Sequence, residues 1–177
     1  MIRACFFAVM FWAPIWSYSA RAQAPVPSAL VAQGEATVLT VHAEGAQIYE
    51  CKAESSGGST WLFREPVATL LLNGKTIGRH YAGPTWELND GSVVTGKVVS
   101  NAPGATSADI PWLKLDAVSH RGNVLLANVT TVQRIETHGG LAQGTCDQPG
   151  SFLSVPYSAE YNLIGSIARL SPQHRAQ

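Results

Sequence analysis

Turn residues interrupt this chain at short intervals, and the segments between them are rich in β-branched and aromatic residues. Asn73-Gly74 lies between two such segments, and it is a strong hairpin signal because both central residues of a type I′ turn need positive φ. Asn89-Asp90-Gly91 separates a second pair of segments in the same way. No convincing amphipathic helix is visible. The pattern predicts an all-β fold, an antiparallel β-sandwich or barrel-like domain built from short strands and hairpins.

The segments between the turns have the length and composition of strands. In the segment 47–52, alternation places Gln47, Tyr49 and Cys51 on one face. Pro111 favours a strand over a helix in the one ambiguous segment. The expected strands cover 37–42, 47–52, 60–64, 66–72, 76–81, 85–88, 93–99, 110–118, 124–135 and 155–163.

The first 24 residues read as a cleaved signal peptide. Arg3 precedes an apolar run over 4–16, which is shorter than the ~20 apolar residues that a membrane-spanning helix needs. Two overlapping Ala-x-Ala sites follow, at 20–22 and 22–24, so we expect the mature chain to begin at Gln23 or Pro25 rather than to keep an uncleaved anchor. We therefore expect a secreted or periplasmic protein.

The rest of the chain divides into a flexible lead-in over 25–34, a single β domain over 35–165 and a C-terminal tail over 166–177. Removal of the expected signal peptide leaves ten basic and twelve acidic residues, a net charge of minus two. The basic residues form no cluster, so we expect neither nucleic acid nor an anionic membrane surface as a partner. No second apolar run is long enough to span a membrane after signal cleavage.

Two cysteines, Cys51 and Cys146, remain after the expected cleavage removes Cys5. In an oxidising compartment they have each other as intramolecular partners, and we expect a disulfide. A metal pair or a reactive thiol is the alternative, but the chain has no CxxC spacing and no neighbouring histidine cluster to support one.

Several segments together resemble an uncharacterised secreted family of bacteria and fungi, the domain of unknown function family 3455. The segments are GAQIYEC, GRHYAGPTWELNDGSVVTGKV, IPWLKL, VTTVQRIETHGG and VPYSAEY, and the similarity covers roughly 34–163. The resemblance implies no established activity. A dehydrogenase label sometimes attached to fungal members finds no support, because the chain lacks the GxGxxG loop of a dinucleotide site.

The densest group of chemically capable side chains lies between residues 80 and 90. Glu87 and Asp90 are candidates for an acid, a base or acceptors of sugar hydroxyls, with His80 as their partner. Tyr81 and Trp86 are candidates for a platform on which a ligand stacks. The competing interpretation is that each of these side chains serves only the turns and the core of its own hairpin.

A tight connection at Gly83-Pro84 predicts that His80 and Glu87 lie on facing strand ends, close enough to form a hydrogen bond. Strand alternation predicts the opposite, because it sends them to opposite faces of the sheet. Both alternatives remain open from the sequence. Trp112 is a further candidate for ligand binding, since the domain carries more large aromatic residues than core filling requires.

No cofactor and no metal site is expected, because the histidines are scattered without one-face spacing. No GxSxG sequence supplies a nucleophile. The sequence favours a domain that binds a small ligand, a saccharide, or an envelope or matrix surface. The alternatives are a hydrolase or lyase that uses His80, Glu87 and Asp90, and a structural envelope component; whether the protein is an enzyme stays open.

Overall fold

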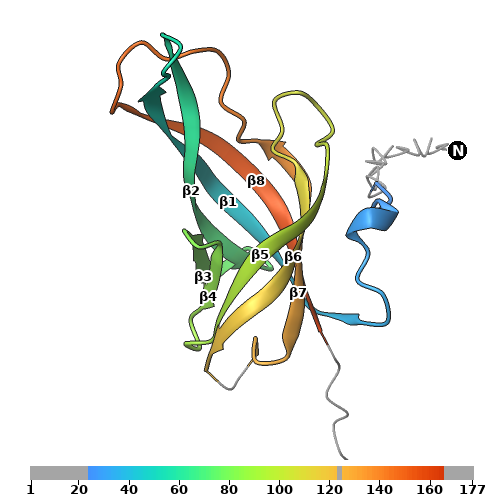
Figure 1. Ribbon diagram of the computed structural model, residues 1–177. Helices are drawn as coiled ribbons and strands as arrows, with labels where there is room; N and C mark the ends of the chain where they lie inside the picture. Colours follow the sequence, from blue (N-terminus) through green and yellow to red (C-terminus); the bar gives the residue numbers. More distant parts are fainter. Residues whose placement is uncertain (1–23, 123–124, 166–177) are drawn as a thin grey trace, which may run out of the picture.

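The computed structural model describes residues 24–122 and 125–165, which form a closed antiparallel barrel (Figure 1). The expected signal peptide, apart from Ala24, and the expected C-terminal tail lie outside the described residues. One short 3-10 helix precedes the strands within the described part. The elements are η1 (Ser28–Leu30), β1 (Ala36–Ala53), β2 (Ser59–Leu72), β3 (Lys75–Tyr81), β4 (Thr85–Leu88), β5 (Val93–Ala102), β6 (Trp112–Arg121), β7 (Val129–Gly139) and β8 (Phe152–Gly165).

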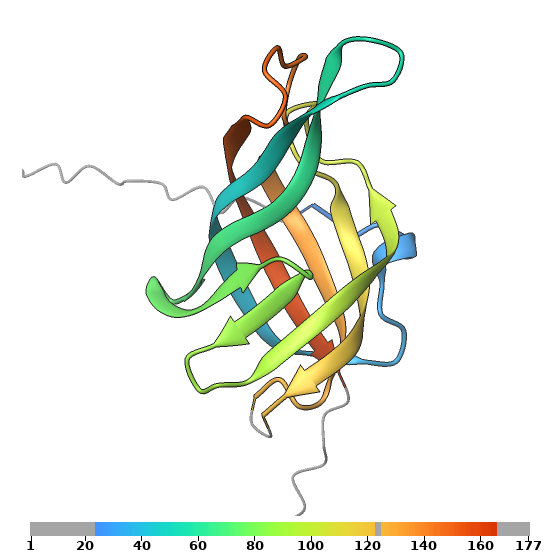
Figure 2. The same cartoon turned by 60° about the vertical axis from the view of Figure 1, so that its left-hand side comes forward.

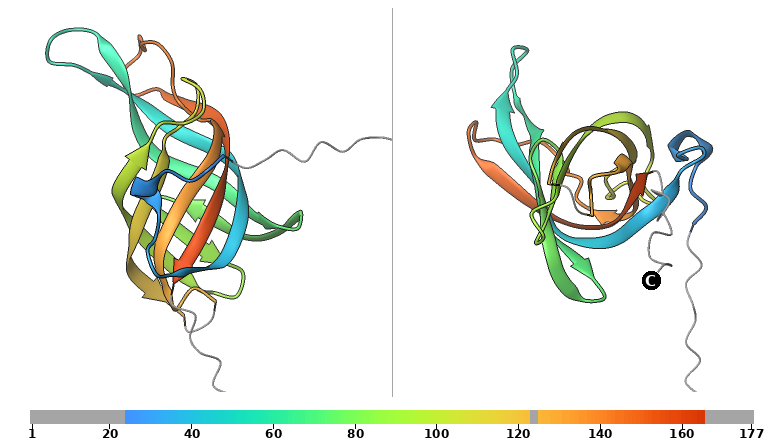
Figure 3. Two further views of the ribbon diagram at one scale, coloured as in Figure 1. Left: turned by 90° about the vertical axis from the view of Figure 1, so that its right-hand side faces the viewer. Right: turned by 90° about the horizontal axis from the view of Figure 1, so that it is seen from below.

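The strands follow one another around the barrel in chain order, and each is hydrogen-bonded to the next (Figure 2). β1 and β8 close the ring, with Ala36 opposite Gly165 at one end of their ladder and Glu50 opposite Phe152 at the other. The view from below in Figure 3 shows the strands as a ring. The all-β prediction is confirmed. Of the two predicted architectures the protein has the barrel.

The two predicted hairpins form at the predicted turns. Asn73 and Gly74 join β2 to β3 with φ of 51° and 74°, as a type I′ turn requires. The turn 89–91 joins β4 to β5, where Oδ1 of Asp90 accepts a hydrogen bond of 2.8 Å from the amide of Ser92. These turns place β3 and β4 side by side, which sets the positions of most of the candidate site residues.

Alternate residues of the strands point into the barrel, where they form one buried core. An eight-stranded barrel is just wide enough for side chains to fill its interior. The filling is incomplete at the end where β2 pairs only with β1, through residues 59–67, because β1 and β2 extend there as an arm beyond β3. The core residues are Val41, Ala43, Ala68, Leu70, Trp86, Leu88, Val94, Ile110, Leu115, Leu126, Val129, Val132, Tyr157, Ala159, Tyr161 and Leu163.

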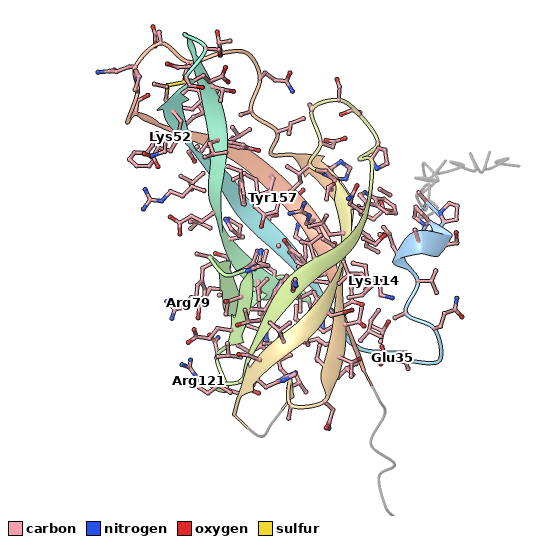
Figure 4. All side chains as sticks on the ribbon, viewed as in Figure 1. Glu35, Lys52, Arg79, Lys114, Arg121 and Tyr157 are labelled. Atoms are coloured by element: carbon pink, nitrogen blue, oxygen red, sulfur yellow. A yellow bond between two sulfur atoms is a disulfide. The ribbon has the colours of Figure 1, made fainter. Side chains whose placement is uncertain are left out.

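The predicted disulfide is present. Cys51 near the end of β1 is joined to Cys146 in the loop before β8, with the two Cα atoms 5.9 Å apart. The distance lies within the range of about 4.4 to 6.8 Å that a disulfide requires. Figure 4 draws the bridge as a yellow bond near the tip of the extended β1–β2 arm. The bridge therefore ties that arm to the loop beside it.

The segment 25–34 lies against the outside of the barrel. Leu30 of η1 is fully buried in a small cluster with Trp112 of β6 and Ile135 of β7. Nε2 of Gln133 donates a hydrogen bond of 2.6 Å to the carbonyl of Leu30. The left view in Figure 3 shows η1 on this outer face. The sequence analysis predicts a flexible lead-in here, whereas the structure shows a docked segment. The segment docks because Leu30 covers the apolar side chains of Trp112 and Ile135 on the outer face of the barrel.

Among the described residues, no helix has the length and apolar composition needed to cross a membrane.

Candidate functional site

A cavity of about 590 Å³ lies at the incompletely filled end of the barrel. Its wall is mostly apolar, and aromatic side chains of β1 and β2 form one side of it. The polar side chains in its wall are few and come from five different strands. The cavity is lined by Gln47, Tyr49, Trp61, Phe63, Arg64, Pro66, His80, Gly83, Pro84, Val98, Ile110, Pro111, Leu113, Leu115, Arg134, Leu141 and Tyr161.

A β-bulge in β2 creates the aromatic side of the cavity. Ile48 of β1 pairs with Glu65, but the next residue, Tyr49, pairs with Phe63. The extra residue, Arg64, shifts the alternation by one, so Phe63 faces the same side as Tyr49. The two rings meet edge to face with centroids 5.7 Å apart. Without the bulge, strand alternation would turn Phe63 away from the cavity.

The loop before β6 closes another side of the cavity and is held by Asp109. Its Oδ1 accepts a hydrogen bond of 2.6 Å from the amide of Gly139, and its Oδ2 accepts two from Thr106. These bonds, first of all the one from Gly139, lower the pKa of Asp109. Ile110 and Pro111, which follow directly, are thereby fixed in the cavity wall.

His80 lies in the cavity wall and is 3% exposed. Its ring stacks on Trp86 with centroids 4.5 Å apart and lies 5.0 Å from the ring of Tyr161. Nδ1 donates a hydrogen bond of 2.9 Å to the carbonyl of Thr85. Burial lowers the pKa of His80 to about 3, although the bond to Thr85 partly opposes this effect. The imidazole is therefore neutral at pH 7, with Nε2 as its unprotonated nitrogen.

Two tyrosines of β8, Tyr157 and Tyr161, are buried in the barrel interior, and the ring of Tyr161 lies beside His80. The hydroxyls of Tyr157 and Tyr161 are 3.4 Å apart, and the two side chains are 4% and 1% exposed. Burial raises the pKa of both, so both are neutral at pH 7. Figure 4 shows Tyr157 inside the barrel. His80 and Tyr161 therefore place uncharged polar side chains in the cavity wall, and the hydroxyl of Tyr157 lies behind them, next to that of Tyr161.

Arg134 of β7 brings a charged side chain to the cavity wall. Its strand neighbours across the sheet are Leu113 and Tyr161, which also line the cavity. Nε and Nη2 of Arg134 donate hydrogen bonds of 3.1 and 2.9 Å to the carbonyl of Pro111. The guanidinium is therefore held at the cavity by a neutral acceptor.

Glu87 lies on the opposite face of the sheet from His80. In the ladder of β3 and β4, His80 pairs with Trp86 inside the barrel, whereas Arg79 pairs with Glu87 outside. Oε2 of Glu87 accepts hydrogen bonds from Tyr81 and Arg79, at 2.8 and 3.0 Å. These bonds, that from Tyr81 first, lower the pKa of Glu87. Figure 4 shows Arg79 projecting from the outer surface.

The prediction that His80 and Glu87 form a hydrogen bond is therefore wrong. The side chains of a strand alternate with a period of two, so an inward His80 forces its neighbours outward, and Glu87 pairs with one of those neighbours. Asp90 lies in the turn after β4, where its carboxylate accepts hydrogen bonds from Ser92 that lower its pKa. The three residues of the hydrolase or lyase hypothesis do not converge.

The aromatic candidates are also separated. Trp86 lies in the core, stacked on His80, and is 1% exposed. Tyr81 lies on the outer surface, where the guanidinium of Arg79 stands 5.1 Å from its ring centroid. Trp112 belongs to the outer cluster beneath η1. Of the residues proposed from the sequence, His80 alone lines the cavity.

Sequence reasoning missed Arg134 and Gln47 as site residues. Alternation places Gln47 on the same face as Tyr49 and Cys51, and the structure shows that this face is buried. A polar residue on an inward face is the signal that indicates a lined cavity. In β7 that signal is hidden, because the segment 129–135 mixes polar and apolar residues on both faces.

No group of three or more His, Cys, Asp or Glu side chains that could hold a metal ion occurs within residues 24–122 and 125–165.

Comparison with known proteins identifies the family. Searches of the curated proteins and of the solved structures found no match. A family model described as "Protein of unknown function (DUF3455)" matches residues 32–165, a range that contains every strand of the barrel. This match confirms the resemblance seen in the sequence. The chain belongs to the DUF3455 family of proteins of unknown function.

Proposed function

We propose that this domain binds a small, largely apolar molecule in the cavity at the open end of its barrel. The observation that supports the proposal is the cavity itself. Its volume of about 590 Å³ falls in the range of ~300 to 1,000 Å³ typical of small-molecule sites. Its construction, an apolar wall with a few polar groups, is also typical of such sites.

The composition of the wall favours an apolar ligand over a saccharide. A buried saccharide needs hydrogen-bonding partners for each hydroxyl, since an unpaired buried hydroxyl costs about 1 to 3 kcal/mol. The wall offers mainly Trp61, Phe63, Val98, Leu113 and Leu115, whose side chains supply apolar surface.

The site chemistry favours binding over the hydrolase or lyase alternative. General acid–base catalysis works best with a group whose pKa lies near the working pH. The pKa of His80, about 3, is far below that range, and its imidazole is held by stacking and by the bond to Thr85. Glu87 and Asp90 are outside the cavity. These features support a role for His80 as a binding-site residue rather than as a general acid or base.

A location outside the cytoplasm is part of this proposal. The disulfide between Cys51 and Cys146 supports it, because such bridges persist in oxidising compartments.

The proposal is tested by filling the cavity. Leu113 of β6 lines it, and Leu113→Trp places a larger side chain there. We expect the wild type to bind N-phenyl-1-naphthylamine, a neutral apolar dye whose fluorescence rises in apolar surroundings. We expect Leu113→Trp to weaken binding about tenfold or more, a loss of about 1.4 kcal/mol of contact energy.

The matched control is Val118→Trp, on the same strand. Val118 is 58% exposed and does not line the cavity, so this variant adds the same side chain elsewhere. Circular dichroism and thermal unfolding establish that both variants fold. A wild type that binds no dye contradicts the proposal, and so does a folded Leu113→Trp variant with wild-type affinity.

A further inference from the structure

Arg134 brings a positive charge to the cavity wall and forms no ion pair with an acidic side chain among residues 24–122 and 125–165. The ion pairs formed within the described residues involve other cations, and none of them includes Arg134. The other arginine of the wall, Arg64, differs in this respect. Its Nε lies 3.3 Å from Oε1 of Glu65, and its guanidinium stands over the ring of Phe152.

The guanidinium of Arg134 retains hydrogen-bonding capacity. It carries five N–H groups in a planar fork, and two of its nitrogens donate to the single carbonyl of Pro111. A carbonyl is a neutral acceptor, so these bonds position the fork but leave its charge uncompensated. A cation beside a mostly apolar wall attracts an anion more strongly than it does in open water.

The titratable side chains whose pKa values are affected by the charge of Arg134 are neutral at pH 7. The electrostatic influence of Arg134 extends to Tyr49, His80, Tyr157 and Tyr161, and it acts on the pKa of each. The three tyrosines have raised pKa values and His80 a lowered one, chiefly through burial. None of these four groups therefore supplies the counter-charge.

A second observation is independent of charge. Three buried polar atoms of the described residues lack a hydrogen-bond partner, Nε2 of Gln47 and Nε1 of Trp86 and of Trp112. Of these residues, only Gln47 lines the cavity, and it is 2% exposed. An unpaired buried donor is destabilising, so an acceptor brought by a ligand would relieve that cost.

We infer that the ligand is a monocarboxylate with an apolar body, whose carboxylate binds Arg134 and takes a hydrogen bond from Gln47. A carboxylate matches the planar fork of a guanidinium and pairs with it through two parallel bonds. One uncompensated arginine balances one negative charge. The apolar remainder of the ligand lies against the aromatic side of the cavity, along Tyr49, Trp61 and Phe63. The inference rests on the proposed function and names its ligand class.

The test compares three probes of one shape and different charge. They are 2-naphthylacetate, 2-(2-naphthyl)ethanol and 2-(2-naphthyl)ethylamine, each titrated against the dye-loaded wild-type protein at pH 7. We expect the carboxylate to displace N-phenyl-1-naphthylamine about tenfold more effectively than the alcohol, since hydrogen bonds to charged groups are the stronger ones. The amine should be the weakest of the three.

The variant Arg134→Gln should remove the preference for the carboxylate and leave the affinity for the alcohol within about twofold of wild type. Arg79→Gln is the matched control on the outer face and should keep the preference. Equal displacement by the three probes, displacement by none of them, or a preference that survives in Arg134→Gln overturns the inference. Dye binding by the wild type remains intact in each of these cases, so the failure is distinct from failure of the proposed function.

The comparison among the three probes uses the wild-type protein and does not depend on any variant folding. If Arg134→Gln fails to fold, Arg134→Lys supplies the second measurement. A lysine keeps the charge but loses the planar fork, so the preference for the carboxylate should fall without vanishing. An unchanged preference in a folded Arg134→Lys variant contradicts a role for the fork.

Discussion

His80 is buried in the cavity wall with its ring stacked on Trp86. The sequence places it beside acids and aromatic residues, a setting that is typical of a catalytic histidine. In the structure its neighbours are the rings of Trp86 and Tyr161, and its one hydrogen bond goes to a backbone carbonyl. Loss of water around the ring disfavours the imidazolium, which makes His80 an uncharged wall residue.

The lowered pKa of His80 predicts how stability depends on pH. The unfolded chain binds a proton at this residue near pH 6.5, whereas the folded protein does so near pH 3. Between these values the unfolded state holds more protons, so the free energy of unfolding falls as the pH falls. From pH 7 to pH 5 we expect a loss of about 1 to 2 kcal/mol from this residue.

Urea unfolding at pH 7 and pH 5 measures this loss, with His80→Phe as the comparison. Phenylalanine keeps an aromatic ring against Trp86 but does not titrate. The variant should lose less stability over this interval than the wild type. Identical losses in the two proteins would show that His80 is not the group responsible.

At the scale of elements, the two faces of β6 and β7 contact different parts of the molecule. The inner face of β6 and β7 contributes Leu113, Leu115 and Arg134 to the cavity. Their outer face carries Trp112 and Ile135, which η1 covers through Leu30. The docked segment therefore keeps an apolar patch on the outer face of these strands from water.

The variant Leu30→Ala tests this docking. Leu30 is fully buried, and truncation of a buried leucine to alanine costs about 2 to 5 kcal/mol. Because the cluster is small, we expect a loss near 2 kcal/mol. Urea unfolding measures the loss, and a red shift of the fluorescence reports exposure of Trp112. Ser28→Ala, at an exposed position of the same helix, should change neither quantity. Equal stability of the two variants would mean that η1 does not dock in solution.

At the scale of the whole molecule, two long-range connections hold the barrel closed. The ladder between β1 and β8 joins the first strand to the last. The disulfide spans 95 residues and joins the end of β1 to the loop before β8. The ladder holds the ends of the domain together only while the barrel is folded. The disulfide is covalent, so it also restricts the unfolded chain, in which those ends would otherwise separate.

Removal of the disulfide should lower the stability of the whole domain. Cys146→Ala leaves the buried Cys51 unchanged, and we expect the free energy of unfolding to fall by about 2 to 5 kcal/mol. Chemical unfolding of the variant, compared with the wild type with and without reductant, measures the change. The reduced wild type should match the variant. An oxidised wild type no more stable than Cys146→Ala would contradict a stabilising role.

The sequence by itself determined the class of the fold, the hairpins and the disulfide, because each depends on local or exclusive chemistry. Asn73 and Gly74 tolerate the positive φ of a tight turn wherever they stand. Cys51 and Cys146 have no other cysteine to pair with once the expected signal peptide is removed. Alternation also placed Gln47, Tyr49 and Cys51 on one face, and the structure shows that this face is buried.

Only the tertiary structure decided which inward residues meet. Gln47, His80, Arg134 and Tyr161 stand on four strands and come together because the sheet closes into a barrel. Tyr81 and Glu87 are close in sequence to His80, yet the pleat turns them outward. Because they are close together in the sequence, the side chains between residues 80 and 90 were predicted to form the site. Strand alternation, the bulge in β2 and ring closure produced a different one, because they set the direction of each side chain and the strands that share an interior.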